Sequence, residues 1–396
     1  MSGMHLSKVK VYLAGICSLI VTIGVARFSY TSLLPLMKAE AGVSEVVGGW
    51  LATSNYLGYM CGVILAASLN KLSYKFALYR LYLLLTVLCT AAMVLTTDTM
   101  MWSILRFISG LCSSAGLIIA SGLILKWLVV NHHRAELGVH FSGVGISILL
   151  TALVVELLFF LALNWQGQWL AFALLAALFS VPAWLWMPNP KFAKTSTGPM
   201  DSKSKTLPKK FILIMLSAYF CAGYGYVVSA TFIVDIIEKV PSLEGRGQWV
   251  FALVGLTAIP AVLIWDRIAR RIGYLRSLFL AYVIQALGII LPTVSDQMAV
   301  MVLSACLFGG TFVACVSLVL TMAGHMLPSN PAKLMGKMTI AYGVAQIIAP
   351  TVTGLLVESF GNYNVGLYLS ATVVCLGALF LLMLIKYENQ QAKFLV

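Results

Sequence analysis

Runs of mostly apolar residues, each about 20 residues long and separated by short polar breaks, recur along the entire chain. A helix needs about 20 such residues to cross the hydrocarbon core of a bilayer. Apolar residues form 61% of the chain and charged residues only 10%, whereas soluble globular proteins carry roughly 25% charged residues. The sequence therefore predicts an all-α membrane protein that crosses the bilayer many times.

The apolar runs fall into two sets of six. We expect membrane spans near 10–36, 47–69, 77–97, 101–127, 137–162 and 168–188, and again near 211–236, 247–265, 275–294, 298–325, 336–358 and 364–386. Between the sets, residues 189–210 are rich in Lys, Ser, Thr and Pro and cannot form an apolar core. We expect an N-terminal six-helix bundle over 1–188, a linker over 189–210 and a C-terminal six-helix bundle over 211–396.

The basic residues are distributed unevenly between the two ends of these spans. The end that holds both termini and the linker carries 21 lysines and arginines, and the opposite end carries three, Lys38, Lys239 and Arg246. Cytoplasmic loops are enriched in these residues, so we expect both termini and the linker to be cytoplasmic. The net charge of +13 is then the topology signal, spread over separate loops, and no nucleic-acid partner is predicted.

Three charged residues, Arg27, Arg106 and Glu156, lie well inside the predicted spans. A charge at the centre of a membrane helix costs about 3 kcal/mol on insertion scales, so it faces the protein interior or a watery cavity. By their positions along the spans, all three belong to the outer half of the first bundle. Two interpretations of Arg106 with Glu156 stay open: a permanent ion pair, or a proton-coupling switch in which Glu156 binds a proton and releases Arg106.

Two patterns are similar to those of the major facilitator transporters. The loop after the eighth span has an aspartate and arginine followed by a small residue and two basic residues, and the loop after the second span has a degraded copy with an amide in place of the acid: Asp266, Arg267, Ala269, Arg270 and Arg271, and Asn70, Lys71, Ser73 and Lys75. In the fourth span, Arg106 precedes Gly110 by four residues. With the six-plus-six spans and the long linker, the resemblance covers essentially the whole chain.

Residues 26–35, 54–58 and 223–232 further resemble an uncharacterised bacterial YbfB-type branch, for which no substrate follows. The resemblance implies a bacterial inner-membrane protein whose two bundles, related by pseudo-twofold symmetry, rock around a central site. It also implies a cytoplasmic gate at Asn70, Lys71, Lys75, Asp266, Arg267, Arg270 and Arg271. The alternative is that these loop residues only set topology and contact lipid head groups.

The same resemblance places the first, second, seventh and eleventh spans around the cavity. Polar and aromatic residues that share a helical face in these spans, with Arg106, are the candidate lining: Arg27, Tyr30, Thr31, Asn55, Tyr59, Arg106, Tyr226, Tyr342 and Gln346. Any uncharged member of this set has an alternative role as a hydrogen-bonding link between helices. Arg27 has no acidic neighbour in its own half except Glu156, and an unpaired guanidinium suits a carboxylate or a phosphate.

We therefore predict a secondary active transporter, and not an enzyme, that moves a small organic solute by alternating access and is coupled to protons. Arg27 and Arg106 alone suggest an anionic solute. The alternative is efflux of drugs, siderophores or metabolites, although residues 141–145 lack the proline of the drug-antiporter signature. A membrane-embedded enzyme would need a nucleophile or metal constellation, and a receptor would usually carry a soluble domain.

The eight cysteines all lie inside apolar runs, with no CxxC pair and no metal-ligand spacing. We accordingly predict no metal site, no disulfide framework and no cofactor. The expected partners are a small-molecule substrate, the lipid bilayer and protons, and we expect the protein to be a monomer.

Overall fold

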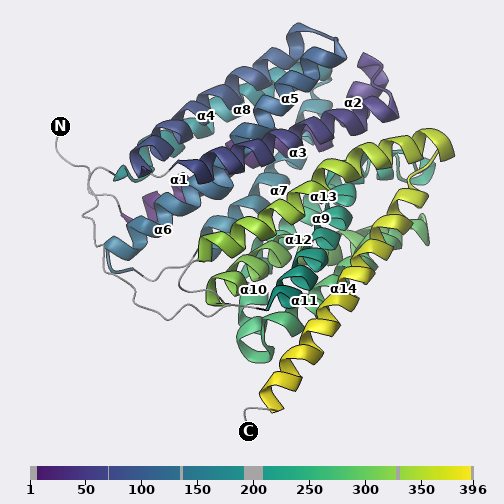
Figure 1. Cartoon of the computed structure of the whole chain (residues 1–396). Coiled ribbons are helices and arrows are strands. Elements are labelled where there is room, and N and C mark those ends of the chain that lie inside the picture. Colours follow the sequence, from purple (N-terminus) through teal and green to yellow (C-terminus); the bar gives the residue numbers. More distant parts are fainter. Residues whose placement is uncertain (1–6, 70, 134–136, 191–207, 327–330, 394–396) are drawn as a thin grey trace.

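The computed structural model describes residues 7–69, 71–133, 137–190, 208–326 and 331–393. Within these ranges the chain contains twelve long helices and no strand (Figure 1). Eleven of these helices are long and apolar enough to cross a membrane. The remaining one, α3 (Glu45–Ser68), is not among them, and it carries Thr53, Ser54 and Asn55 in its middle. The prediction of an all-α membrane protein with twelve spans is confirmed.

Six long helices form the first half of the chain. In order they are α1 (Lys8–Leu19), η1 (Ile20–Phe28) and α2 (Ser29–Ala41) as one continuous helix; α3; α4 (Leu72–Ala92) with η2 (Met93–Leu95); α5 (Thr99–Ser114), η3 (Ala115–Ala120) and α6 (Ser121–Val130) as one continuous helix; α7 (Gly138–Phe160); and α8 (Trp165–Trp186). The segments η1 and η3 are π-helical. Such segments are rare inside α-helices and occur frequently at functional sites.

Six further helices form the second half. They are α9 (Lys209–Glu238), followed by the short turn η5 (Pro241–Leu243); α10 (Gly247–Ile272); α11 (Tyr274–Ile290) with η6 (Leu291–Thr293); α12 (Met298–Met326); α13 (Pro331–Phe360); and α14 (Asn364–Lys393). Most of the predicted linker, residues 191–207, lies outside the described residues. The helix bounds agree with the predicted spans to within a few residues at most ends.

Polar residues in the short breaks fix where the helices begin. Ser44, Asp98 and Asn164 each accept a hydrogen bond from a backbone N–H in the first turn of the next helix, at distances of 3.2, 2.8 and 2.9 Å. These side chains satisfy N–H groups that have no partner inside the helix. After α2, Gly42 adopts φ +70°, a left-handed conformation that glycine takes without strain.

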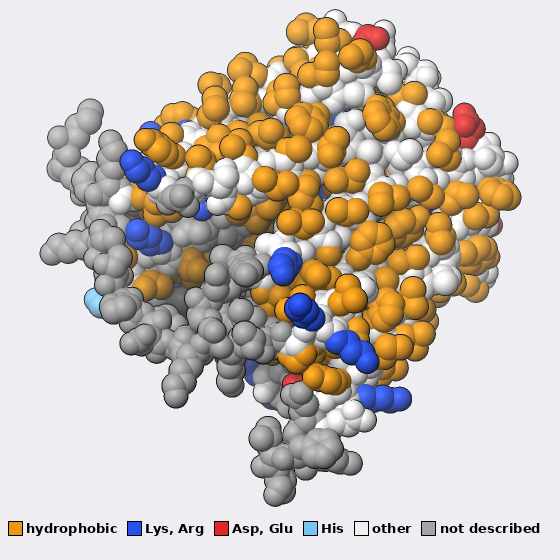
Figure 2. Space-filling model, viewed as in Figure 1, with side chains coloured by type: hydrophobic (Ala, Val, Ile, Leu, Met, Phe, Trp, Pro, Cys, Tyr) orange, Lys and Arg blue, Asp and Glu red, His pale blue; other side chains and the backbone are white. Residues whose placement is uncertain are grey.

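We call the end of the molecule at which α1 begins and α14 ends the terminal end, and the opposite end the far end. Figure 2 shows apolar side chains over the sides of the helices, most visible lysines and arginines toward the terminal end, and acidic side chains at the far end. Many leucines on the sides are exposed, for example Leu84, Leu174 and Leu178. Such an apolar belt between two polar ends fits a protein surrounded by lipid.

The helices of the two halves form two groups that lie side by side (Figure 1). The groups meet mainly where α3 packs on α13 and where α7 packs on α10. These are the second, eleventh, fifth and eighth long helices. The second helix of the first half corresponds to the eighth, which is the second helix of the second half. The fifth and eleventh helices correspond in the same way, so the two contacts are equivalent. This correspondence is what a pseudo-twofold relation between the halves requires.

Candidate functional site

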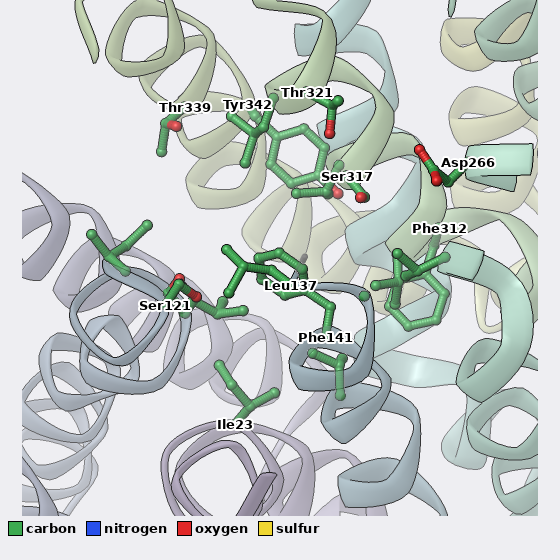
Figure 3. Close-up of a pocket in the computed structure, with 18 of the residues that line it drawn as sticks. Ile23, Ser121, Leu137, Phe141, Asp266, Phe312, Ser317, Thr321, Thr339 and Tyr342 are labelled. Atoms are coloured by element: carbon green, nitrogen blue, oxygen red, sulfur yellow. The ribbon is translucent and has the colours of Figure 1, made fainter. Parts of the chain in front are cut away.

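A cavity of about 1020 Å³ lies between the two groups of helices. It runs from the middle of the helices to the terminal end, and side chains from both halves point into it (Figure 3). Its inner end is formed by polar and aromatic residues, namely Arg27, Tyr59, Tyr219, Tyr226, Tyr342 and Gln346. Its mouth includes Asp266, Arg267 and Arg270. Cavities of this size accommodate small organic molecules.

Arg27 is the charged residue at the inner end of the cavity. Arg27 lies in η1 and is only 7% exposed to solvent. Its guanidinium carbon lies 4.1 Å from the ring centroid of Tyr56, 5.4 Å from that of Tyr59 and 5.9 Å from that of Tyr226. Its Nε and Nη2 have no hydrogen-bond partner among the described residues. Arg27 therefore lines the cavity with a cation that rests on tyrosine rings and has no carboxylate partner among the described residues.

The backbone next to Arg27 is held by an unusual set of hydrogen bonds. The carbonyl oxygen of Ala26 accepts from Asn55 Nδ2 at 3.2 Å, from Arg106 Nη1 at 3.0 Å and from Ser109 Oγ at 3.1 Å. Three donors from α3 and α5 therefore converge on one carbonyl of the π-helical segment. Asn55 and Arg106, both predicted as cavity residues, do not line the cavity and instead position the backbone that carries Arg27.

Asn55→Ala tests this positioning. Asn55 Nδ2 also donates to the carbonyl of Arg106 at 3.0 Å, so the change removes two buried hydrogen bonds, each contributing about 1 kcal/mol. We expect a lower melting temperature and a roughly tenfold weaker affinity for the cavity ligand, because Arg27 loses its fixed position. Ser113→Ala is the matched control, since Ser113 bonds only to Ser109 of its own helix. If Asn55→Ala lowers stability but leaves the affinity unchanged, Asn55 only joins the helices.

Two other predicted cavity residues lie beyond the inner end of the cavity, toward the far end. Tyr30 is buried under the Arg106 guanidinium at 4.4 Å and donates to the carbonyl of Gly48 at 2.8 Å. Thr31 donates to the carbonyl of Ala230 at 3.0 Å and so joins the two halves. Neither residue lines the cavity. Thr31 lies on the same helical face as Arg27, about one turn closer to the far end. At that level the two halves are in contact, so no cavity remains for Thr31 to line.

The wall of the cavity opposite Arg27 is aromatic. The ring of Tyr226 stacks on Phe312 with centroids 5.4 Å apart and on Tyr342 with centroids 5.8 Å apart, and Tyr342 also lies 4.5 Å from Tyr219. Gln346 has an amide oxygen without a hydrogen-bond partner among the described residues. Tyr226, Tyr342 and Gln346 were in the predicted lining, and Tyr219 and Phe312 were not. Phe312 stands in a largely apolar helix and has no feature that distinguishes it from a packing residue.

Glu156 and Arg106 do not meet, so neither of the two open interpretations, a permanent ion pair or a proton switch in which Glu156 releases Arg106, is formed in this structure. Glu156 Oε1 accepts from Trp249 Nε1 of the other half at 3.2 Å, while Arg106 is bound to Ala26 and stacked on Tyr30. The described residues contain no salt bridge between the two. Both residues are at similar depths, but Glu156 faces α10 and Arg106 faces the interior of its own half.

The predicted gate residues are only partly together. Asp266 Oδ2 forms an ion pair with Arg270 of the same helix at 2.6 Å, and with Arg267 these residues lie at the mouth of the cavity. Lys71, Lys75 and Arg271 do not line the cavity, and Asn70 lies outside the described residues. The described residues of the predicted gate form no ion pair between the two halves, because the halves are apart at this end.

Between the inner end of the cavity and the far end, in contrast, the halves are in close contact. Tyr56 and Thr231 hydrogen-bond across the halves at 3.0 Å, and Thr53 Oγ1 donates to the carbonyl of Ile347 at 2.9 Å. A Cβ on Gly49 would lie 2.5 Å from the carbonyl oxygen of Pro350, so the α3 and α13 backbones touch. The described structure is thus closed at the far end and open at the terminal end.

Comparisons with known proteins agree with this architecture. Residues 19–382 match the family described as the uncharacterised MFS-type transporter YbfB. The quinolone resistance transporter of Acinetobacter baumannii is 23% identical over 385 residues, covering 86% of this chain and 85% of that protein. Azole resistance protein 1 of Saccharomyces cerevisiae is 25% identical over 167 residues, covering 40% of this chain and 27% of the yeast protein, so the chain spans about a quarter of that relative.

The fold has a solved counterpart. The crystal structure of the nucleoside transporter NupG superimposes with a TM-score of 0.75 at 15% identity, covering 97% of this chain and 100% of NupG. At this identity the likeness shows the fold. The family match extends over most of the chain, and the members and relatives are transporters and not enzymes. The chain therefore belongs to the major facilitator superfamily, in the family of the uncharacterised MFS-type transporter YbfB.

Proposed function

We propose that this protein is a secondary active transporter that moves a small organic anion with a planar portion across the bacterial inner membrane by alternating access. The cavity opens at the terminal end, which carries most of the basic loops and which we assign to the cytoplasm. The structure then represents the cytoplasm-facing state. In the opposite state, the halves rock so that the mouth closes and the far end opens.

The observation that carries the substrate assignment is the environment of Arg27. The buried guanidinium lines the cavity and has no carboxylate partner among the described residues, and a carboxylate or phosphate is the ligand group that pairs with such a cation. The wall formed by Tyr226, Phe312 and Tyr342 offers flat faces to a ring. An anionic group and a planar ring on one molecule would engage both features.

Ligand-induced stabilisation tests this assignment. A panel of small acids, each paired with its neutral amide or ester, is added to the purified full chain at pH 8 and at pH 6. A ligand that binds only the folded state raises the melting temperature. We expect aromatic acids to raise it more than their neutral analogues and more than aliphatic acids of equal charge. Equal shifts for acids and neutral analogues would remove the anion from the proposal.

Proton coupling is the second element of the proposal. It is tested in vesicles that hold the purified protein and an imposed pH gradient, with the best panel ligand as the labelled solute. Coupled transport gives accumulation against the ligand gradient, which disappears when a proton carrier collapses the pH gradient. Accumulation that continues after the proton carrier has collapsed the pH gradient would show that transport is driven by an energy source other than protons.

Efflux of drugs or metabolites is the second candidate, because two relatives are named for resistance to azoles and quinolones. The aromatic cavity wall accommodates apolar rings as well as acids. Flux in the vesicles measured in both directions separates the two candidates: import requires accumulation on the side of the terminal end, and efflux requires accumulation on the side of the far end.

A further inference from the structure

Five polar residues form a cluster at the far end, which the mechanism above does not use. Lys38 Nζ lies 2.5 Å from Glu45 Oε2 and 2.5 Å from Asp235 Oδ2, and Lys239 Nζ lies 2.5 Å from Glu45 Oε1. The hydroxyl of Tyr363 donates to Asp235 Oδ2 and also lies 3.3 Å from Glu45 Oε2. We call these residues the far-end cluster. With both lysines protonated and both carboxylates ionised, the cluster is electrically neutral.

The far-end cluster joins the two halves. Lys38 and Glu45 come from α2 and α3 of the first half, whereas Asp235, Lys239 and Tyr363 come from the second half. Both the Lys38–Asp235 and the Lys239–Glu45 ion pairs therefore cross between the halves. Opening the far end must separate these pairs, since the cluster sits where α2 and α3 meet α9.

Burial within the far-end cluster increases from one side to the other. The side chains of Lys239 and Glu45 are 34% and 23% exposed, that of Lys38 is 13% exposed, and that of Asp235 is 4% exposed. Solvent at the far end therefore reaches Glu45 first and Asp235 last. An ion pair as buried as that of Asp235 depends strongly on both partners keeping their charge.

Tyr363 remains a donor to these carboxylates. Burial, and then the negative charges of Asp235 and Glu45, raise the pKa of the Tyr363 phenol well above its usual value. The other polar groups around the cluster have partners of their own. Glu40 accepts from the backbone N–H of Trp165, Glu238 accepts from two backbone N–H groups, and Tyr30 donates to Gly48. The proton-accepting atoms of the cluster are thus the carboxylates of Glu45 and Asp235.

We propose that the far-end cluster is a proton-binding site that controls opening of the far end: a proton from the far-end solvent neutralises Asp235, ends its ion pair with Lys38 and unlocks the two halves. The inference rests on the proposed alternating access. Only a proton is transferred, from solvent to a carboxylate oxygen, and the cluster then carries one net positive charge. External acid therefore favours the open far end.

The distance between two far-end loops tests this lock. Thr97 and Gln297 are exposed residues of opposite halves, remote from the cluster in the sequence. Nitroxide labels on Thr97→Cys and Gln297→Cys, in a full chain with its native cysteines replaced and placed in lipid nanodiscs, report their separation by pulsed electron paramagnetic resonance. We expect a longer-distance population that grows as the pH is lowered from 8 to about 4, where carboxylates take up protons.

Asp235→Asn mimics the protonated acid. We expect the ratio of open to closed far ends at pH 8 to rise roughly tenfold, because the closed state loses one partner of a buried ion pair. Its remaining response to pH should be smaller than that of the native chain, and Glu45→Gln should act in the same direction. Glu40→Gln is the matched control: this acid lies on the same helix as Lys38, but it bonds within its own half, so its distances should match the native ones.

Two results would overturn the lock. One is an unchanged distance distribution in Asp235→Asn, Glu45→Gln and the double variant, each verified as folded by its melting curve. The other is an undiminished pH response in the double variant. The proposed function fails separately: ligand stabilisation through Arg27 is measured without labels, so a chain that binds its ligand but ignores far-end pH disproves only the lock.

Discussion

Replacing Arg27 with alanine is expected to weaken binding of the cavity ligand by about 100-fold, since removing one partner of a desolvated charge pair costs roughly 2–5 kcal/mol. The guanidinium is buried at the inner end of the cavity with two unpaired nitrogen atoms. Arg27→Lys should fall between the native chain and Arg27→Ala, because lysine keeps the charge but lacks the planar fork. The measurement is the dissociation constant of the best acid from the panel, with its neutral analogue beside it.

The neutral analogue distinguishes charge recognition from general damage. It should lose far less affinity than the acid when Arg27 is replaced, because it never formed the charge-assisted bond. Arg276→Ala removes the same charge from an exposed position on α11 that does not line the cavity, and it should bind the acid like the native chain. Equal losses for acid and analogue, or a native affinity in Arg27→Ala, would show that Arg27 does not recognise the anion.

The spans could be predicted from sequence because lipid leaves few choices. A chain in a bilayer must satisfy its backbone hydrogen bonds within each segment, so every long apolar run becomes a helix. Even α3, the one long helix of the twelve that is not among those long and apolar enough to cross a membrane by composition, was identified, since Thr53, Ser54 and Asn55 interrupt it without breaking its length. The polar breaks supplied the caps at Ser44 and Asp98.

The inner end of the cavity was also largely predictable. Arg27, Tyr59, Tyr226, Tyr342 and Gln346 stand out as polar groups within apolar helices, and the structure places all five on the cavity wall. A membrane protein seldom buries such groups without a partner or a function, so they draw attention without any structural information. The cavity's apolar contributors gave no comparable signal.

What could not be predicted was the direction in which a side chain points around its helix. Depth along a span follows from counting residues, and Arg106 and Glu156 are at similar depths. Rotation depends on packing between helices, and it sends Glu156 to Trp249 and Arg106 to Ala26. For the same reason the far-end cluster was missed, because Asp235 near the end of its span looked like an ordinary boundary residue.

Gly110→Ala is expected to reduce the stability of the protein by about 3 kcal/mol or to prevent folding, at the upper end of what overpacking usually does. A Cβ at Gly110 would lie 1.8 Å from the carbonyl oxygen of Asn55, and a Cβ at Gly58 would lie 1.9 Å from that of Phe107. The α3 and α5 backbones thus touch at two glycines, as small residues allow in membrane helix pairs. Backbone on both sides leaves the new methyl group no flexible neighbour to displace.

Gly122→Ala is the matched control, because Gly122 belongs to the same continuous helix and a Cβ there would meet nothing within 4 Å. Alanine is a better helix former than glycine by about 1 kcal/mol, so Gly122→Ala should melt at or slightly above the native temperature. Gly110→Ala should melt well below it. The clash also pushes on Asn55, which holds the carbonyl of Ala26 beside Arg27, so any folded fraction should bind the acid more weakly. A native melting temperature in Gly110→Ala would show that the helices separate without penalty and that the arginine and glycine of the fourth span do not form one unit.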